Sequence, residues 1–149
     1  STRLPYGACS LGFPPQLIKT IYGAIKIYDT RAGNDTDFPK ELHDDPELNM
    51  IGKAGREIGT TTGRTRTVNW FNMDKLIKSI NMTGSNYIII SKVDILKQVN
   101  IFKLILDNVI VQFGSFTEMS LYITSCLHTH CKFVKNVIYS DSQEHVNIV

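Results

Sequence analysis

The stretch NYIIISK, residues 86–92, constrains the fold more than any other segment of this sequence. Short continuous apolar runs of this kind are typical of strands in a parallel sheet that is covered on both faces. The preceding segment, 73–82, has its apolar residues at helical spacing, with Asn72 as a candidate N-cap. Because strand-like and helix-like patterns alternate along the chain, we predict an α/β fold with a partly parallel sheet and flanking helices.

The remaining segments continue the alternation. We predict helices over 14–23, 46–59 (ended by Gly59) and 116–133, a polar loop over 32–47, and strands over 24–31, 101–106, 109–113, 136–140 and 145–149. No internal repeat or low-complexity segment interrupts this pattern. We therefore treat residues 1–149 as part of one domain.

Composition excludes several classes of protein. The chain has 42% hydrophobic and 20% charged residues, as soluble globular proteins do, and a net charge of +2. That charge is too small to predict binding to nucleic acid or to an acidic membrane surface. No apolar run approaches the roughly 20 residues that span a bilayer, and the first residues lack a signal-peptide pattern. Three cysteines, an odd number, fit a reducing compartment, so we predict a cytoplasmic protein.

The run GTTTGRTRTVNW, residues 59–70, has the chemistry of an anion-binding loop. Gly59 and Gly63 allow positive φ and a close approach of the backbone to a ligand. Threonine hydroxyls add short donors, while Arg64 and Arg66 offer planar forks that bind carboxylates or phosphates through paired hydrogen bonds. The alternative is a solvent-exposed loop whose arginines pair with neighbouring acidic residues.

Three further blocks are informative together: GREIGTTTGRTRTVNWFNMDKL (55–76), GAIKIYDTRAGNDTDFPKEL (23–42) and IIISKVDIL (88–96). In their sequence, their order and nearly in their spacing, they resemble the adenylosuccinate synthetase family. The third block resembles the family's guanine-recognition strand. The match extends over roughly residues 10 to 100. The resemblance implies the C-terminal part of an adenylosuccinate synthetase-like, P-loop-related fold.

The family joins L-aspartate to IMP at the expense of GTP, with Mg²⁺, and the resemblance implies roles for individual residues. The aspartate- and IMP-binding set would be Thr60, Thr61, Thr62, Gly63, Arg64, Thr65, Arg66 and Ala32. Ala32 replaces the family's valine beside the nucleotide. The GTP-binding set would be Arg66, Lys92, Val93, Asp94, Ser140 and Asp141. The last two lie in a segment without the family's glycine-proline pair. For Lys92 and Asp94 the alternative is a solvated strand end.

The chain also departs from the family pattern. It has no glycine-rich phosphate loop, and the family's catalytic aspartate and histidine lie before the matched region, so no catalytic or metal-binding residue is assigned. We therefore expect the C-terminal portion of an enzyme that is homodimeric when complete, with Mg²⁺ held mainly elsewhere and no turnover by residues 1–149 alone. The alternatives are a viral-type enzyme acting on dGMP to give 2-aminoadenylosuccinate nucleotides, and a non-catalytic nucleotide-binding remnant.

Other patterns are set aside. On a helix, Cys126 shares a face with His130, and His128 shares one with Cys131, so CLHTHC cannot readily direct four ligands at one metal ion. Neither Cys126 nor Cys9 has an orienting partner for nucleophilic catalysis. The acidic residues of 32–47 fit no calcium loop. We expect Trp70 to pack the loop against the following helix rather than to stack on a base.

Overall fold

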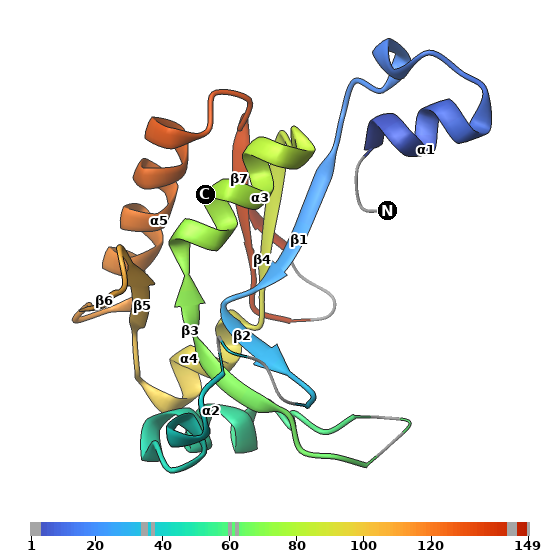
Figure 1. The fold of residues 1–149 in the computed structure, drawn as a ribbon. Helices are drawn as coiled ribbons and strands as arrows, with labels where there is room; N and C mark the ends of the chain where they lie inside the picture. Colours follow the sequence, from blue (N-terminus) through green and yellow to red (C-terminus); the bar gives the residue numbers. More distant parts are fainter. Residues whose placement is uncertain are drawn as a thin grey trace.

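The computed structural model describes residues 4–33, 36, 38–59, 61, 63–142 and 146–148. Its elements follow in chain order (Figure 1). They are α1 (Leu4–Leu11), η1 (Pro15–Leu17), β1 (Tyr22–Lys26), β2 (Tyr28–Arg31), η2 (Lys40–His43), α2 (Pro46–Ala54), β3 (Thr67–Asn72), α3 (Met73–Thr83), β4 (Tyr87–Ser91), α4 (Val93–Val99), β5 (Lys103–Leu106), β6 (Val109–Gln112), α5 (Phe116–His130), β7 (Asn136–Ser140) and β8 (Val146–Ile148). The predicted α/β class is confirmed. None of the described helices is long and apolar enough to cross a bilayer.

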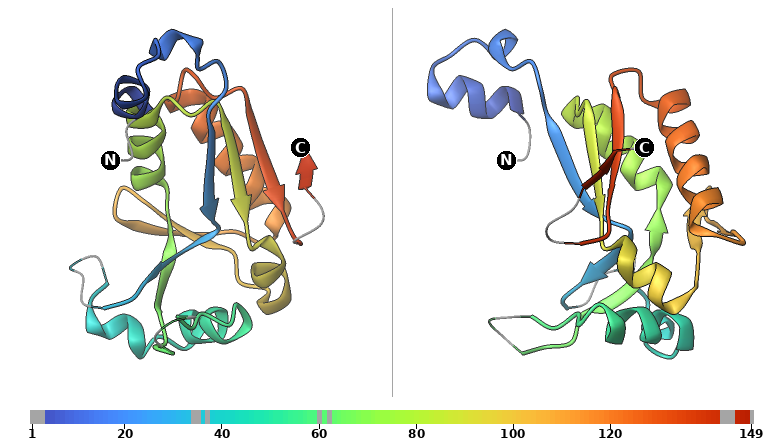
Figure 2. Two further views of the ribbon diagram at one scale, coloured as in Figure 1. Left: turned by 90° about the vertical axis from the view of Figure 1, so that its right-hand side faces the viewer. Right: turned by 180° about the vertical axis from the view of Figure 1, so that it is seen from behind.

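The first sheet is mainly parallel. Its order is β1-β4-β7-β8, in which β1, β4 and β7 run parallel and β8 is antiparallel. The arrowheads of the three parallel strands point to the same edge (Figure 2). Ile88 and Ile90 of β4 are buried, whereas Tyr87, Ile89 and Ser91 on the other face are only half-buried. The prediction of burial on both faces is thus met on one face only, because α3 and α5 lie on the same side of the sheet.

The second sheet continues from the first. Its order is β2-β3-β5-β6, with β3 and β5 parallel and the outer pairs antiparallel. The chain passes from β1 to β2 through the buried Ile27, whose N–H donates to Ser91 O at 2.9 Å. Since β2 pairs with β3, it places residues 30–33 beside the segment that enters β3 at Thr67. This pairing positions the candidate site.

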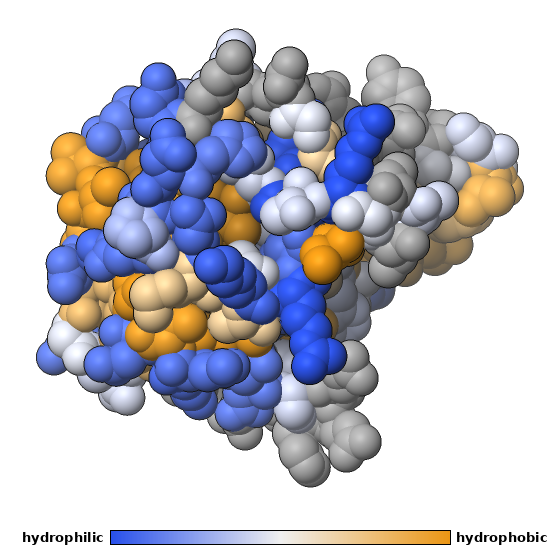
Figure 3. All heavy atoms as spheres, turned by 90° about the horizontal axis from the view of Figure 1, so that it is seen from below, coloured by the Kyte–Doolittle hydropathy of each residue, from blue (hydrophilic) through white to orange (hydrophobic). Residues whose placement is uncertain are grey.

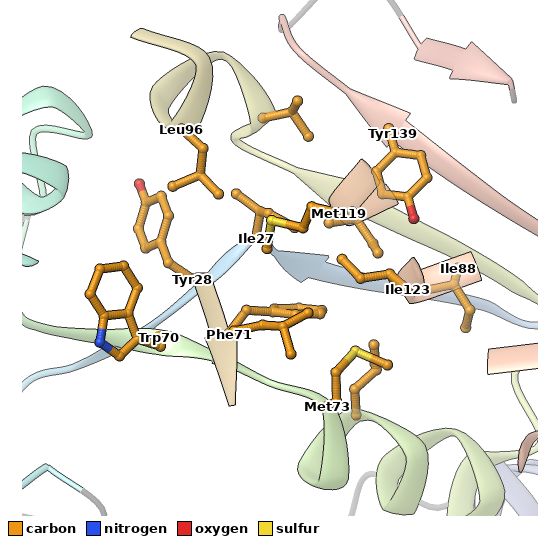
Figure 4. Close-up of a cluster of buried hydrophobic side chains, with 14 of the residues drawn as sticks. Ile27, Tyr28, Trp70, Phe71, Met73, Ile88, Leu96, Met119, Ile123 and Tyr139 are labelled. Carbon is orange, nitrogen blue, oxygen red and sulfur yellow. The ribbon is translucent and has the colours of Figure 1, made fainter. Parts of the chain in front are cut away.

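One hydrophobic core joins both sheets to their helices (Figure 4). Tyr28 and Phe71 come from the second sheet, Ile88 from the first and Met119 from α5, and each of these side chains is at most 1% exposed. Trp70 is buried in the same cluster at 3% exposure, which agrees with the packing role expected for it. The core therefore fixes the strands from which the candidate site projects.

Two helix predictions are confirmed in place. Asn72 caps α3 by accepting from Lys75 N at 3.0 Å, and Ser115 caps α5 by accepting from Glu118 N at 3.2 Å. Caps of this type satisfy backbone donors that have no partner inside the helix. The strands predicted over 101–106 and 109–113 are present but shorter, 136–140 has the predicted bounds, and β8 lies within 145–149. The single strand predicted over 24–31 is wrong in one respect, because it divides at Ile27 into β1 and β2, which belong to different sheets.

Other predictions are wrong. The helix expected over 14–23 is reduced to η1, and β1 begins at Tyr22 because parallel pairing with β4 overrides the local helical spacing. The helix over 46–59 ends at Ala54, with Gly55 rather than Gly59 as its cap. The strand predicted over 86–92 is confirmed as β4, but the rest of the block 88–96 forms α4 instead of continuing the strand. The turn occurs at Lys92, whose φ is +67°. The helix α1 was not predicted.

Candidate functional site

The loop between α2 and β3 has a hydrogen-bonded base. Arg66 N donates to Glu57 O at 2.9 Å, and Ile58 and Thr65 form an isolated antiparallel bridge. Gly59 N donates to Arg64 O at 2.8 Å, and Gly63 N donates to Gly59 O at 2.8 Å. Gly63 has φ +65°, which confirms the positive φ expected there, whereas Gly59 does not have positive φ and that expectation is wrong. We call residues 57, 58, 65 and 66 the loop base and 59–64 the loop tip.

At the loop base, Glu57 is a buried carboxylate with two hydrogen-bonded partners and a second cation close by. Lys26 Nζ donates to its two oxygens at 2.9 and 2.8 Å, and Tyr28 Oη donates to Oε1 at 2.8 Å. An Arg66 guanidinium nitrogen lies 3.5 Å from Oε2. Glu57 is 5% exposed, while Arg66 retains 36% exposure. Arg66 thus pairs with an acid, as the alternative interpretation of the loop required, yet it still reaches solvent.

The electrostatics of this cluster favour an ionised Glu57. Burial is the largest single influence and raises the pKa of the carboxyl, but it is outweighed by hydrogen bonds from Lys26 and Tyr28 and by the charges of Lys26 and Lys92. The net result is a pKa below the ordinary value. For Tyr28, burial and then the Glu57 carboxylate raise the pKa, so the phenol stays a hydrogen-bond donor. Lys26, Lys92 and Arg66 therefore bring positive charge to Glu57, and Asp94 adds a second negative charge near Tyr28.

A cavity of about 450 Å³ lies beside this cluster. It is lined by Thr30, Arg31, Ala32, Gly33 and Arg66. Pairing of β2 with β3 brings the two sides together, since Arg31 is in register with Thr67. The structure thus unites two of the predicted site residues, Ala32 and Arg66. Thr30 is tied to the buried cluster because Lys26 Nζ also lies 3.3 Å from its hydroxyl.

A second cavity, of about 460 Å³, lies between α2, η2 and the loop base. Leu42, Leu48, Ile58 and Val68 give it apolar walls, and Lys53, Arg56 and Arg66 bring positive charge. Seen from below, this end of the molecule shows hydrophobic patches between strongly hydrophilic side chains (Figure 3). Arg66 lines both cavities, so its side chain stands between two spaces of similar volume.

The other loop residues divide into two groups. Thr61, Gly63, Arg64 and Thr65 are exposed, and of these only Thr65 lines one of the two cavities just described. Thr60 and Thr62 lie outside the described residues. The structure therefore places Arg66 against the cavity with Ala32 and leaves Arg64 on the outward tip.

The residues predicted to bind guanine gather at the carboxyl edge of the parallel sheet. Lys92 follows β4 directly, with Val93 buried and Asp94 exposed in the first turn of α4. Ser140 ends β7, the neighbour of β4 in the sheet, and Asp141 follows it. Ligands of open α/β sheets bind outside this edge. The structure thus places five predicted residues, in two groups about 50 positions apart in the sequence, at one edge of the sheet.

Contacts with neighbours hold these residues in place. Lys92 is half-buried and donates from Nζ to Gly55 O at 3.4 Å, which links this edge to the end of α2. Asp141 pairs with Lys97 of α4 at 3.3 Å, and Ser140 Oγ donates to Ser142 O at 2.8 Å. Lys92 is therefore more enclosed than the solvated strand end considered as its alternative, whereas Asp94 remains open to solvent.

Sequence reasoning missed the centre of the site. It assigned no role to Glu57, Lys26 or Tyr28, although these side chains form the buried cluster. A signal was available: Lys26 and Tyr28 lie two apart in a strand-like run, and a lysine there needs a partner when the strand is buried. The single acid of the GREIG block is that partner.

The CLHTHC segment forms no metal site among the described residues, which contain no group of three or more His, Cys, Asp or Glu placed to hold an ion. Cys126 lies on α5, and Cys131 is the buried residue that caps the C-terminal end of this helix. Burial raises the pKa of both thiols. The charges of Asp74 and Asp107 add to this effect at Cys126, and Cys126 adds to it at Cys131. Raised thiol pKa values disfavour the thiolate that nucleophilic catalysis requires.

Comparison with known proteins gives a consistent result. Residues 1–118 match the family model described as adenylosuccinate synthetase. The adenylosuccinate synthetase of Methanococcoides burtonii is 36% identical over 104 residues, which are 69% of this chain and 24% of the relative. That of Paramecium tetraurelia is 41% identical over 91 residues, or 60% of this chain and 21% of the relative. The chain thus matches about a quarter or less of these relatives.

The fold agrees with that comparison. The structure of fully ligated adenylosuccinate synthetase from Plasmodium falciparum superposes with a TM-score of 0.71 at 15% identity. The match covers 99% of this chain and 44% of that one. The arrangement of strands and helices described above is therefore shared with a part of that solved protein.

Proposed function

This chain belongs to the adenylosuccinate synthetase family, and on that premise we propose that it is the aspartate- and guanine-nucleotide-binding part of a ligase. The whole enzyme would act in purine biosynthesis, joining L-aspartate to IMP at the expense of GTP. The observation that carries this proposal is the cavity that Ala32 and Arg66 line together, beside the cluster in which Lys26 and Arg66 meet Glu57.

The proposed chemistry divides between the two arginines. In the family's reaction, the γ-phosphoryl group of GTP moves to O6 of IMP, and the amine of aspartate then displaces that phosphate. Arg66, at the cavity wall, would neutralise phosphate charge as the group is transferred, a form of charge stabilisation common in phosphoryl transfer. Arg64 and the threonines of the tip would bind the carboxylates of aspartate, for which bidentate guanidinium pairing is well suited.

The carboxyl edge of the first sheet would bind the guanine base. The carboxylate of Asp94 can accept hydrogen bonds from guanine N1–H and N2–H, a pair of donors that adenine does not offer. Lys92 and Val93 would support the base beside it, with Ser140 and Asp141 on the neighbouring strand. The parallel order of β4 and β7 supports this assignment, because it aligns both segments at one edge.

The chain would work together with the rest of the family fold. On the side of the first sheet away from α3 and α5, Tyr22 is 62% exposed and stacks on Tyr87 with ring centroids 5.2 Å apart. Ala24 on the same side is exposed as well. Parallel sheets are ordinarily covered on both faces, so this side is suited to contact with a further part of the protein.

We propose a cytoplasmic homodimer for the whole enzyme.

Mg²⁺ would be held mainly by the part of the enzyme outside this chain. The residues described here contain no cluster of three His, Cys, Asp or Glu that could hold an ion. We assign none of them to the metal and place no step of the reaction on it. The proposed part of this chain is to bind the anions that surround the reacting phosphate.

IMP is the purine substrate proposed here, because both named relatives are adenylosuccinate synthetases. A viral-type reaction on dGMP and a non-catalytic remnant are the outcomes against which the proposal is tested. Calorimetric titration of the chain with GTP, IMP, dGMP and L-aspartate separates them. We expect heat from GTP, preference for IMP over dGMP, and no adenylosuccinate formation by residues 1–149 alone. Preference for dGMP, or binding of none of these compounds, would contradict it.

A further inference from the structure

We propose that Glu57 is a positioning residue, which holds Arg66 against one of its two cavities and sets the distance between the cavity's two walls. The inference rests on the proposed function, since it concerns how the same anion site is kept in shape. Glu57 itself lines only the apolar cavity and does not line the one that contains Ala32. It would therefore act through other side chains rather than by touching a ligand there.

The contacts of Glu57 connect both walls of the Ala32 cavity. On one side, Lys26 Nζ lies 2.8 Å from Oε2 and 3.3 Å from the hydroxyl of Thr30, a lining residue. On the other side, an Arg66 nitrogen lies 3.5 Å from Oε2. Thr30 belongs to β2, while Arg66 precedes β3, so one carboxylate links the two segments that face each other.

Burial makes this link specific. Glu57 is 5% exposed, and Tyr28, only 1% exposed, donates its hydroxyl hydrogen to Oε1. Tyr28 in turn is packed in the central core, which fixes the phenol (Figure 4). A carboxylate held by a core side chain has little freedom, and so it can restrain the more exposed arginine. The core of the protein is thereby connected to the anion site through Tyr28 and Glu57.

Arg66 needs such a restraint because it borders two spaces. Its side chain lines the polar cavity with Ala32 and also the apolar cavity under α2. Arginine carries several rotatable bonds and loses substantial entropy when it is held in one conformation. Without Glu57 the guanidinium could turn into either cavity, and the anion would have to order it on binding.

Charge and position predict opposite effects of one substitution. Glu57→Gln removes a negative charge from the surroundings of Lys26, Lys92 and Arg66, and Coulomb attraction alone would then make anions bind more tightly. A positioning role predicts weaker binding, because Arg66 is no longer held. We expect the affinity for Mg²⁺-GTP to fall about tenfold, the size of about one lost charge-assisted hydrogen bond.

The experiment combines NMR of the arginine side chains with calorimetry on the full chain. In ligand-free native protein, we expect a distinct Arg66 Nη–H signal with slowed hydrogen exchange, because a terminal guanidinium nitrogen makes the contact with Glu57. In Glu57→Gln that signal should broaden or exchange rapidly, and GTP affinity should fall. The matched control is Glu47→Gln. It removes the carboxylate that pairs with Lys103 and leaves the loop base intact. It should change neither the Arg66 signal nor the affinity for GTP.

A second variant keeps the test valid if Glu57→Gln does not fold. Glu57→Asp retains the charge but draws the carboxylate back by one methylene, so positioning predicts weaker GTP binding and a purely electrostatic role predicts no change. The proposal is overturned if the Arg66 signal is unchanged in the folded variants, or if GTP binds them as tightly as it binds the native chain. If the native chain binds no GTP, the proposed function fails. Loss of the Arg66 signal in Glu57→Gln would still support the positioning role.

Discussion

The base and the tip of the loop between α2 and β3 are held in different ways. At the base, Glu57 is buried, bound to Lys26 and Tyr28, and paired with Arg66. At the tip, Arg64 is exposed and the fold is maintained by backbone hydrogen bonds that close on Gly59. The difference shows that two arginines only two positions apart can contribute differently: one lies against a buried carboxylate, and the other is an exposed side chain.

The largest effect is expected at the base. Glu57→Ala leaves Lys26 and Arg66 without their buried partner and Tyr28 without an acceptor, so the free energy of unfolding should fall by about 3 kcal/mol. The partial exposure of both cations keeps the loss below that of a fully buried pair. Urea denaturation measures it. Glu47→Ala, at a more exposed ion pair, should cost about 1 kcal/mol or less; equal losses would remove the distinction drawn here.

Gly55→Ala should have the next largest effect. A Cβ at this position would overlap the hydroxyl oxygen of Tyr28 and come within 3.2 Å of Ile51 O. Because Glu57 fixes that hydroxyl, the ring cannot move aside freely, and we expect a loss of about 2 kcal/mol in unfolding free energy. Thermal denaturation provides the measurement. In a Tyr28→Phe background the added methyl should cost clearly less, and an unchanged cost would show that Tyr28 is not the obstacle.

Low pH should destabilise the loop base by a smaller amount, through protonation of Glu57. The pKa of Glu57 is lowered from its ordinary value of 4.5 in the folded protein, so its stabilising contribution is complete above about that pH. As pH falls further, the unfolded chain takes up the proton first, and the contribution is lost as pH passes through the folded pKa. Between pH 5 and 3, native stability should fall more steeply than that of Glu57→Gln, by at most about 1.4 kcal/mol per pH unit. Parallel slopes would place the acid-sensitive group elsewhere.

The smallest effect on stability is expected at the tip. Arg64→Leu replaces an exposed side chain, so the free energy of unfolding should change by less than about 0.5 kcal/mol. Aspartate binding should nevertheless weaken about tenfold, because a charged hydrogen-bonding group is lost from the proposed contact. A melting curve and an aspartate titration on the same sample test both statements. Unchanged aspartate affinity would count against the role assigned to Arg64.

Much of the fold was predictable from local pattern. The strand at Tyr87–Ser91 and the helix after Asn72 follow from an apolar run and a capping residue, signals that need no distant partner. The start of β1 at Tyr22 and Gly23 could not be assigned in this way, because it is set by pairing with β4, more than 60 residues later in the chain. The turn at Lys92 was missed since its positive φ is set by tertiary context.

The candidate site was predictable in its outer parts. Arg66 and Ala32 were singled out by motif, and the structure places both at one cavity. The centre of the site was not predictable from motif, because the role of Glu57 depends on side chains from β1 and β2 that only folding brings near it. A buried acid can be identified from sequence only when its cationic partner is also expected to face inward.

A crystal structure of the chain with L-aspartate and a guanine nucleotide tests the central claim most directly. The account predicts Arg66 and Arg64 within hydrogen-bond distance of phosphate or carboxylate oxygens, with Glu57 still bound to Lys26 and Tyr28. Ligands bound elsewhere, with both arginines directed into solvent, would contradict it.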